Sequence, residues 1–170
     1  MATFGETGDL GSDLGLKTQY ATCYYTTLTE TASVSKLTAR LHDGGGTGYV
    51  RGFIAANNGG IPGALTATTS SVQMAGDNSW TLRDLPFATN VELSAGNYWL
   101  GVYYDASSEN IICDALGSVH SYFDDTLSFP TTLVPATFHD GGANTRFQLY
   151  ATYTAPVGWS GLTVIRDVSS

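Results

Sequence analysis

Basic residues are scarce in this chain of 170 amino acids. Seven lysines and arginines stand against fifteen acidic residues, which gives a net charge of −8. The seven lie scattered and form no basic stripe of the kind that follows a phosphate backbone. Apolar runs are also short, and none approaches the roughly 20 residues needed to cross a bilayer. The sequence therefore argues against direct nucleic-acid binding and against a membrane-spanning segment.

Signals for export are missing as well. The first ten residues, MATFGETGDL, lack the charged and apolar regions of a signal peptide. We therefore expect a chain that is made without export or whose signal was removed. The only cysteines, Cys23 and Cys113, lie in apolar strand-like settings. An unexported chain stays reduced, so we expect two buried free thiols, with a disulfide as the alternative if the two strands are neighbours.

What the chain does contain favours β-structure. Thr, Tyr, Val and Gly are abundant while Glu and Lys are rare, and 42% of the residues are hydrophobic, enough for a real core. The strongest stretch is Ser94 to Asp105, SAGNYWLGVYYD, in which a turn-forming entry leads into aromatic and aliphatic residues. Both faces of this strand are apolar. It belongs either in a sheet packed on both sides or in one whose aromatic patch a partner covers.

The other segments alternate in the same way. From Val34 to His42, the residues Leu37, Ala39 and Leu41 face one side, and the opposite face is expected to be wet. The Gly-rich turn at 43–48 predicts a hairpin into a strand at 49–55. We expect a strand at 80–85 ended by Pro86, a short one at 91–93, and residues 109–115 as the return arm of a hairpin.

Further strands are expected at 2–6, 20–28, 64–74 and 145–154, and residues 116–142 read as a long covering loop with one or two short strands. We therefore predict an all-β fold, an antiparallel β-sandwich or jelly roll of about ten strands with little or no helix. The sandwich domain spans residues 1–155, and residues 156–170 form a C-terminal tail or arm.

The tail carries a small β-prone cluster after an aromatic residue. Disordered tails are usually poor in such residues, so this piece either packs back on its own domain or adds a strand to a neighbouring subunit. We take its large side chains as partner-binding candidates. They are Trp159, Leu162, Val164 and Ile165.

No catalytic or metal-binding constellation stands out. The three histidines, His42, His120 and His139, have no metal-ligand spacing, and no Gly-x-Ser-x-Gly motif is present, so we expect no enzyme activity. Acidic loops offer oxygen ligands that suit calcium, although hydrated turn residues explain them equally well. We expect no cofactor. The weak calcium candidates are Asp9, Asp13, Asp124 and Asp125.

Several short motifs occur in an order that resembles a known group of modules. They are Phe4-Gly5-Glu6, NNGGIPGAL at 57–65, DLPF at 84–87, LSAGNYWLGVYY at 93–104 and LYATYT at 149–154. Over residues 3 to 155, the chain is similar to the jelly-roll, carbohydrate-binding-type modules of secreted bacterial proteins and of tailed-phage structural proteins. We expect no leader and no attached catalytic domain, and on that expectation the resemblance favours a small virion component.

Two functions follow from this resemblance and from the residues. The first is a noncatalytic structural virion protein on the virion exterior, a capsid decoration (cement) protein or another exterior component. It contacts other subunits, such as capsid or tail proteins, and forms a homo-oligomer or part of a larger assembly. The second is a secreted or cell-surface carbohydrate-binding or adhesin module, in which exposed rings of Trp80, Trp99 and Tyr103 stack on sugars. Core packing is the other interpretation of Trp80 and Trp99.

Overall fold

The chain folds into two antiparallel sheets packed face to face. The computed structural model describes residues 1–8, 13–16, 20–42, 48–74, 79–105, 111–116, 120–124, 138–140 and 146–156, and within these ranges it contains strands and no helix. The prediction of an all-β, sandwich-like fold is confirmed. The described residues form two sheets of seven strands each, so the expected number of about ten is not confirmed.

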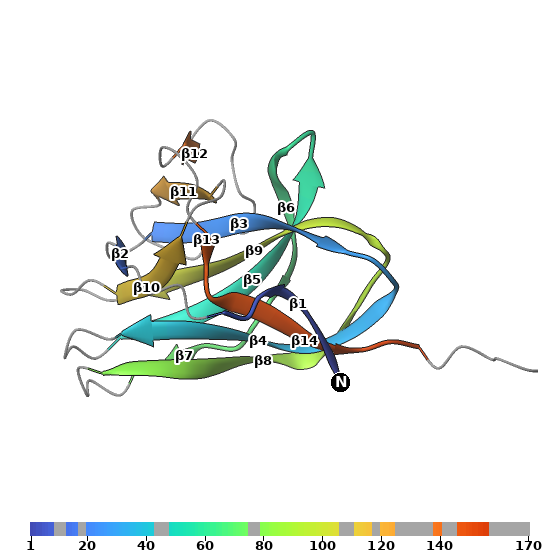
Figure 1. Ribbon diagram of the computed structural model, residues 1–170, viewed down its shortest axis with the longest axis horizontal. Helices are drawn as coiled ribbons and strands as arrows, with labels where there is room; N and C mark the ends of the chain where they lie inside the picture. The colour runs from blue at the N-terminus through green and yellow to red at the C-terminus, as the bar shows by residue number, and fades with distance from the viewer. Residues whose placement is uncertain are drawn as a thin grey trace, which may run out of the picture.

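Each sheet combines segments that are far apart in the sequence (Figure 1). Sheet I contains β1 (Ala2–Glu6), β2 (Asp13–Leu16), β4 (Ala32–His42), β8 (Trp80–Leu93), β10 (Ile111–Leu116), β13 (Arg146–Phe147) and β14 (Leu149–Thr154). Sheet II contains β3 (Tyr20–Leu28), β5 (Tyr49–Asn58), β6 (Ile61–Thr68), β7 (Val72–Gln73), β9 (Gly96–Asp105), β11 (His120–Asp124) and β12 (Phe138–Asp140).

The main core lies between the sheets and uses alternate residues of each strand. Leu37, Ala39 and Leu41 of β4 are fully buried, as are Leu100 and Val102 of β9. Because side chains alternate across a strand, the residues between them face outward. The predicted inward face of β4 is therefore confirmed, and fully burying each large aliphatic side chain stabilises the fold by about 2 kcal/mol.

Tyr24 links the two sheets at one edge. Tyr24 belongs to β3 in sheet II, and its two partners belong to sheet I. Its hydroxyl accepts a hydrogen bond from the Glu6 backbone N–H at 2.7 Å and donates one to the Leu149 carbonyl. Gly5 makes room for this contact. Its φ is +108°, and a Cβ there would lie 2.5 Å from the Tyr24 hydroxyl oxygen. A side chain at position 5 would be strained and would displace the link.

A short segment after β6 joins the sheets on the opposite side. The Thr69 N–H donates to the Gly52 carbonyl of β5 at 2.9 Å, and the Ser70 N–H donates to the Pro86 carbonyl of β8 at 3.0 Å. The Thr69 hydroxyl accepts a hydrogen bond from the Gly52 N–H at 2.8 Å. One segment thus satisfies backbone groups of both sheets and closes the side of the core.

Two predicted hairpins are wrong because the chain changes sheet where each was expected, and one predicted strand end is wrong because the strand continues. β4 lies in sheet I and β5 in sheet II, so they do not form a hairpin, and β10 pairs with β2, β4 and β13 instead of β9. Pro86 does not end its strand, since β8 continues to Leu93. Among the described strands β8 pairs only with β4, which leaves an edge where the missing N–H of proline is tolerated.

Two further strands differ in extent from the prediction. The expected strand at 64–74 is divided into β6 and β7, and the strand at 145–154 is divided at Gln148 into β13 and β14. In the expected loop at 116–142, the structure describes the short strands β11 and β12. The inward direction predicted for Leu149, Ala151 and Tyr153 is confirmed by their burial.

Candidate functional site

The side chains at the centre of the outer face of sheet II are buried. A second buried cluster lies there, formed by Ala21, Cys23, Phe53, Ala55, Trp99 and Tyr103. The ring of Phe53 lies across Gly101 of the neighbouring strand. A Cβ at position 101 would therefore collide with three ring carbons of Phe53. From Trp99 to Tyr103, β9 is therefore buried on both faces, which was one of the two expectations for this strand.

This packing decides the role of two predicted sugar-stacking residues. The exposed fraction is 1% for Trp99 and 2% for Tyr103. Neither ring presents a face to a ligand, so the sequence reading of these two residues as glycan platforms is corrected in favour of core packing. An apolar outer face on a strand is compatible both with an exposed binding patch and with a second buried core. Only the burial of its side chains distinguishes the two.

Trp80 lies in a different environment, on the outer face of sheet I. It is partly exposed and pairs across the strands with His42, with ring centroids 5.3 Å apart. The Arg40 guanidinium lies 5.2 Å from the centroid of the Trp80 ring, which is the geometry of a cation–π contact. Leu82, paired with Arg40, is 55% exposed. An aromatic ring, a cation and an exposed aliphatic side chain thus lie together.

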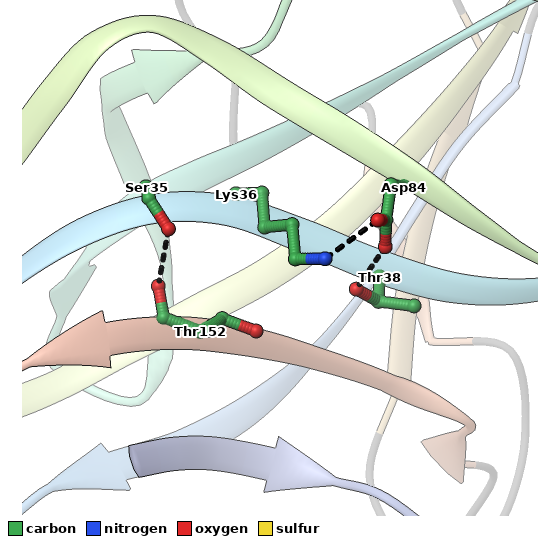
Figure 2. A network of polar contacts seen from close by, with 5 residues as sticks. All are labelled: Ser35, Lys36, Thr38, Asp84 and Thr152. Carbon is green, nitrogen blue, oxygen red and sulfur yellow. Dashed lines mark hydrogen bonds and ion pairs between the residues drawn. The ribbon is translucent and has the colours of Figure 1, made fainter. Parts of the chain in front are cut away.

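Polar side chains continue this face along β4 and β8 (Figure 2). The Lys36 ammonium donates to one carboxylate oxygen of Asp84 at 2.5 Å, and the Thr38 hydroxyl donates to the other at 2.8 Å. The Lys36 hydrogen bond, assisted by that of Thr38, lowers the pKa of Asp84 below its ordinary value, against a smaller effect of burial. Ser35 donates to the Thr152 carbonyl of β14 at 3.3 Å, which ties a third strand to the same face.

We call this surface the Trp80 face. It consists of Lys36, Thr38, Arg40 and His42 of β4, with Trp80, Leu82 and Asp84 of β8. The β4 residues are those that alternation placed on the outward side, and the structure leaves three of them partly exposed while burying Thr38. Of these seven residues, the sequence analysis identified only Trp80 as a binding candidate. It missed Arg40 and Leu82 because strand pairing brings them to Trp80 from positions that carry no motif.

A smaller polar and aromatic group lies at one end of the outer face of sheet II. Tyr25 is 39% exposed, and its ring stands against Trp99 with centroids 5.5 Å apart. The Trp99 indole N–H donates to the Asn57 side-chain oxygen at 3.2 Å, and Thr27 donates to the Asn97 side-chain oxygen at 2.9 Å. We call these five residues the Tyr25 corner. No sequence pattern pointed to it, since its members come from three strands.

The remaining candidates are separated by the fold or lie outside the described residues. Asp13 belongs to β2 in sheet I and Asp124 to β11 in sheet II, so the two do not share a sheet. Asp9, Asp125 and the four tail residues, Trp159, Leu162, Val164 and Ile165, are outside the described ranges. In the part of the chain that the structure describes, no group of three or more His, Cys, Asp or Glu residues could hold a metal.

Cys23 is buried in the outer cluster of sheet II, whereas Cys113 belongs to β10 in sheet I. A search of the described residues for a long apolar helix able to span a membrane gave none. Comparison with known protein families and with curated proteins gave no match for this chain.

Proposed function

We propose that this chain is a noncatalytic structural protein of a virus particle, a capsid decoration (cement) protein or another exterior component that acts through protein–protein contacts. The observation that carries the proposal is the Trp80 face, where Leu82 is 55% exposed beside a tryptophan in contact with an arginine. Trp and Arg are enriched among the residues that dominate binding energy at protein interfaces.

The construction of this face supports contact rather than chemistry. Its strands are backed by the fully buried residues Leu37, Ala39 and Leu41, so the outward side chains are presented on a rigid support. The Lys36–Asp84 ion pair lies along the same two strands and would form a polar rim beside the apolar centre at Leu82. An apolar centre with a polar rim is the usual anatomy of a specific interface.

The sequence resemblance over residues 3 to 155 supports a place on the virion exterior, with capsid or tail proteins as partners. The net charge of −8 would keep the surface facing solvent soluble. In this proposal the residues 156–170 act as an arm on a neighbouring subunit, and a homo-oligomer or larger assembly follows. The jelly-roll connectivity is part of the same proposal.

The alternative, a carbohydrate-binding or adhesin module, retains one of its three predicted residues. Trp80 is partly exposed, whereas Trp99 and Tyr103 are buried. The Arg40 side chain lies over the Trp80 ring, and a sugar would have to use the ring area that remains. This arrangement suits a protein partner better than a pyranose ring.

Particle binding tests the proposal. Capsids purified from the virus whose genome encodes this chain should carry the protein. Empty capsids should bind the recombinant chain in a sedimentation assay. Leu82→Asp should weaken this binding roughly thirtyfold or more, since it places a charge at the centre of the contact. Thr66→Asp, at an exposed position of β6 in the other sheet, is the matched control and should bind normally.

Absence of the protein from purified particles would contradict the proposal, and so would normal binding by Leu82→Asp. A chain truncated after Ala155 tests the arm separately. If the truncated protein assembles and binds as the full chain does, the tail is not a contact element, while the Trp80 face keeps its role.

A further inference from the structure

β8 forms an open edge of sheet I. Among the described strands it pairs only with β4, and in Figure 1 it runs along the lower border of the body beside that strand. An edge strand presents backbone N–H and C=O groups that can pair with a further strand. The direction of these groups along β8 therefore decides whether another chain can be added.

The backbone of Leu82 points toward this open edge. The Arg40 N–H donates to the Gln148 carbonyl at 3.0 Å, on the side of β4 that faces β14. Opposed residues in an antiparallel pair exchange both hydrogen bonds or neither, so Arg40 and its partner Leu82 exchange none. The N–H and C=O groups of Leu82 therefore point away from β4. Because this pattern alternates along a strand, the backbone groups of Trp80 and Asp84 do the same.

The edge is protected at Pro86. Proline has no N–H, and the Pro86 carbonyl, which also points away from β4, accepts a hydrogen bond from the Ser70 N–H at 3.0 Å. Proline and a covering segment are common means of blocking an edge strand. From Trp80 to Asp84 the described part of the chain supplies no such cover, since none of its groups bonds to the outward backbone groups there. A short stretch of β8 thus remains open to pairing.

One register lets the β8 strand of a second copy use every open group. With Leu82 opposite its own counterpart in an antiparallel pair, Trp80 lies opposite Asp84, and all three residues form hydrogen-bonded pairs. A shift of two residues would place Trp80 opposite Pro86, which has no N–H and whose carbonyl is already bonded. A shift of one residue would place outward groups opposite inward groups, so that no hydrogen bond forms.

The side chains of the outer face agree with this register. The two Leu82 side chains, each 55% exposed, would lie directly opposite and cover one another. The Asp84 carboxylate of each copy would lie opposite Trp80 of the other, and the Arg40 guanidinium lies 5.2 Å from the centroid of that ring. An acidic end of the stretch thus meets a cationic end on both sides of the axis, which gives a two-fold contact its charge complementarity.

We propose that two copies of this chain pair through the Trp80–Asp84 edge of β8, antiparallel and centred on Leu82. This inference rests on the homo-oligomer of the proposed function and names its interface. Sheet I continues from one copy into the other, and the two Trp80 faces join into one surface because their side chains lie on the same side of the combined sheet.

Sedimentation velocity of the full chain tests the pairing in the absence of particles. The protein should contain dimer at about 0.1 mM, since a contact of this length belongs to the small, weak class of interfaces. Leu82→Asp should weaken dimerisation roughly thirtyfold or more, because it places two like charges directly opposite each other. Thr89→Asp is the matched control. It adds one negative charge at an exposed position of β8 beyond Pro86 and should leave the dimer unchanged.

Oxidative cross-linking with copper(II) phenanthroline tests the register. Leu82→Cys should form a covalent dimer, since the Cα atoms of a hydrogen-bonded antiparallel pair lie about 5.5 Å apart, within disulfide reach. Asp84→Cys should not, because its partner in this register is Trp80 and the two new thiols would lie far apart. The wild type measures any cross-linking through the native cysteines, of which Cys23 is buried.

Three results would overturn the proposal: a wild-type chain that stays monomeric at about 0.1 mM, a dimer that survives Leu82→Asp, or cross-linking of Asp84→Cys in preference to Leu82→Cys. The proposed particle contact is judged separately. Capsids that fail to bind the chain leave the dimer in solution unaffected, and a monomeric chain that still binds capsids removes only the dimer.

Discussion

The outer faces of the two sheets show how one strand pattern can serve two purposes. On sheet II, Phe53 covers Gly101 between Trp99 and Tyr103, and these aromatic rings are buried. On sheet I, Trp80 stays partly exposed among polar residues, and Leu82 is largely exposed. Large aromatic residues on the outer face of a strand are therefore not evidence of a binding surface by themselves. What distinguishes a binding surface is whether the chain covers them.

The difference also separates stability from function. Substitutions in the buried cluster of sheet II should affect folding first, because close-packed interiors tolerate added volume poorly. Substitutions on the Trp80 face should change partner binding with little effect on folding, since surface positions usually contribute within 0.5 kcal/mol or so. The following predictions test this contrast, beginning with the largest expected effect.

Gly101→Ala should destabilise the protein by about 3 kcal/mol, because the added methyl group collides with the Phe53 ring. Urea denaturation measures the loss. Gly96→Ala, on the same strand, is the control, since the nearest atom to its Cβ would be 3.7 Å away, an ordinary contact distance. Adding Phe53→Leu to Gly101→Ala should recover part of the stability. A Gly101→Ala variant as stable as the wild type would show that the outer cluster is not packed as described.

Tyr24 and Tyr25 are neighbours in sequence and face opposite sides of β3. Tyr24→Phe should lower the free energy of unfolding by about 2 kcal/mol, because the Glu6 N–H and the Leu149 carbonyl both lose their partner. Tyr25→Phe removes an exposed hydroxyl and should change it by less than about 0.5 kcal/mol. Equal effects of the two changes, measured by urea denaturation, would refute the assignment of their faces.

Asp84→Asn should have the smallest effect, a loss of about 0.5 kcal/mol at pH 7, since exposed ion pairs contribute little. Asn can still accept the Thr38 hydrogen bond, so the change isolates the charge. Glu92→Gln, an exposed carboxylate change on the same strand, is the control and should have no such effect.

The loss should also depend on pH. The pKa of Asp84 is lowered in the folded protein, so its stabilising effect is present above the ordinary value of 3.8 and disappears as the pH falls through the lowered value. Wild type and Asp84→Asn should therefore converge in acid. An undiminished difference at a pH well below 3.8 would show that the ion pair is not its source.

Much of the fold could be predicted from alternation alone. The bounds of β1 and β3 agree with the strands expected at 2–6 and 20–28, and the inward residues of β4 and β14 were assigned correctly. Local pattern failed where the outcome depends on which sheet a strand joins. The sequence predicted a hairpin between β4 and β5 and another between β9 and β10, yet in each pair the two strands lie in different sheets.

The candidate sites were harder to predict for the same reason. Trp80 was identified as an aromatic in a strand, but Arg40 and Leu82 become its neighbours only through the pairing of β4 with β8. Pro86 suggested a strand end because proline has no N–H to donate. That lack matters only in a strand that is paired on both sides, and among the described strands β8 pairs with β4 alone. Sequence gives the face of each residue, whereas the partner across the strands comes from topology.

Hydroxyl-radical footprinting read by mass spectrometry tests the central contrast most directly. In the unbound protein Trp80 and Leu82 should be oxidised, and Trp99, which is 1% exposed, should remain unmodified. On purified particles Trp80 and Leu82 should be protected. Strong oxidation of Trp99 in the unbound protein, or unchanged oxidation of Trp80 and Leu82 on the particle, would contradict the account.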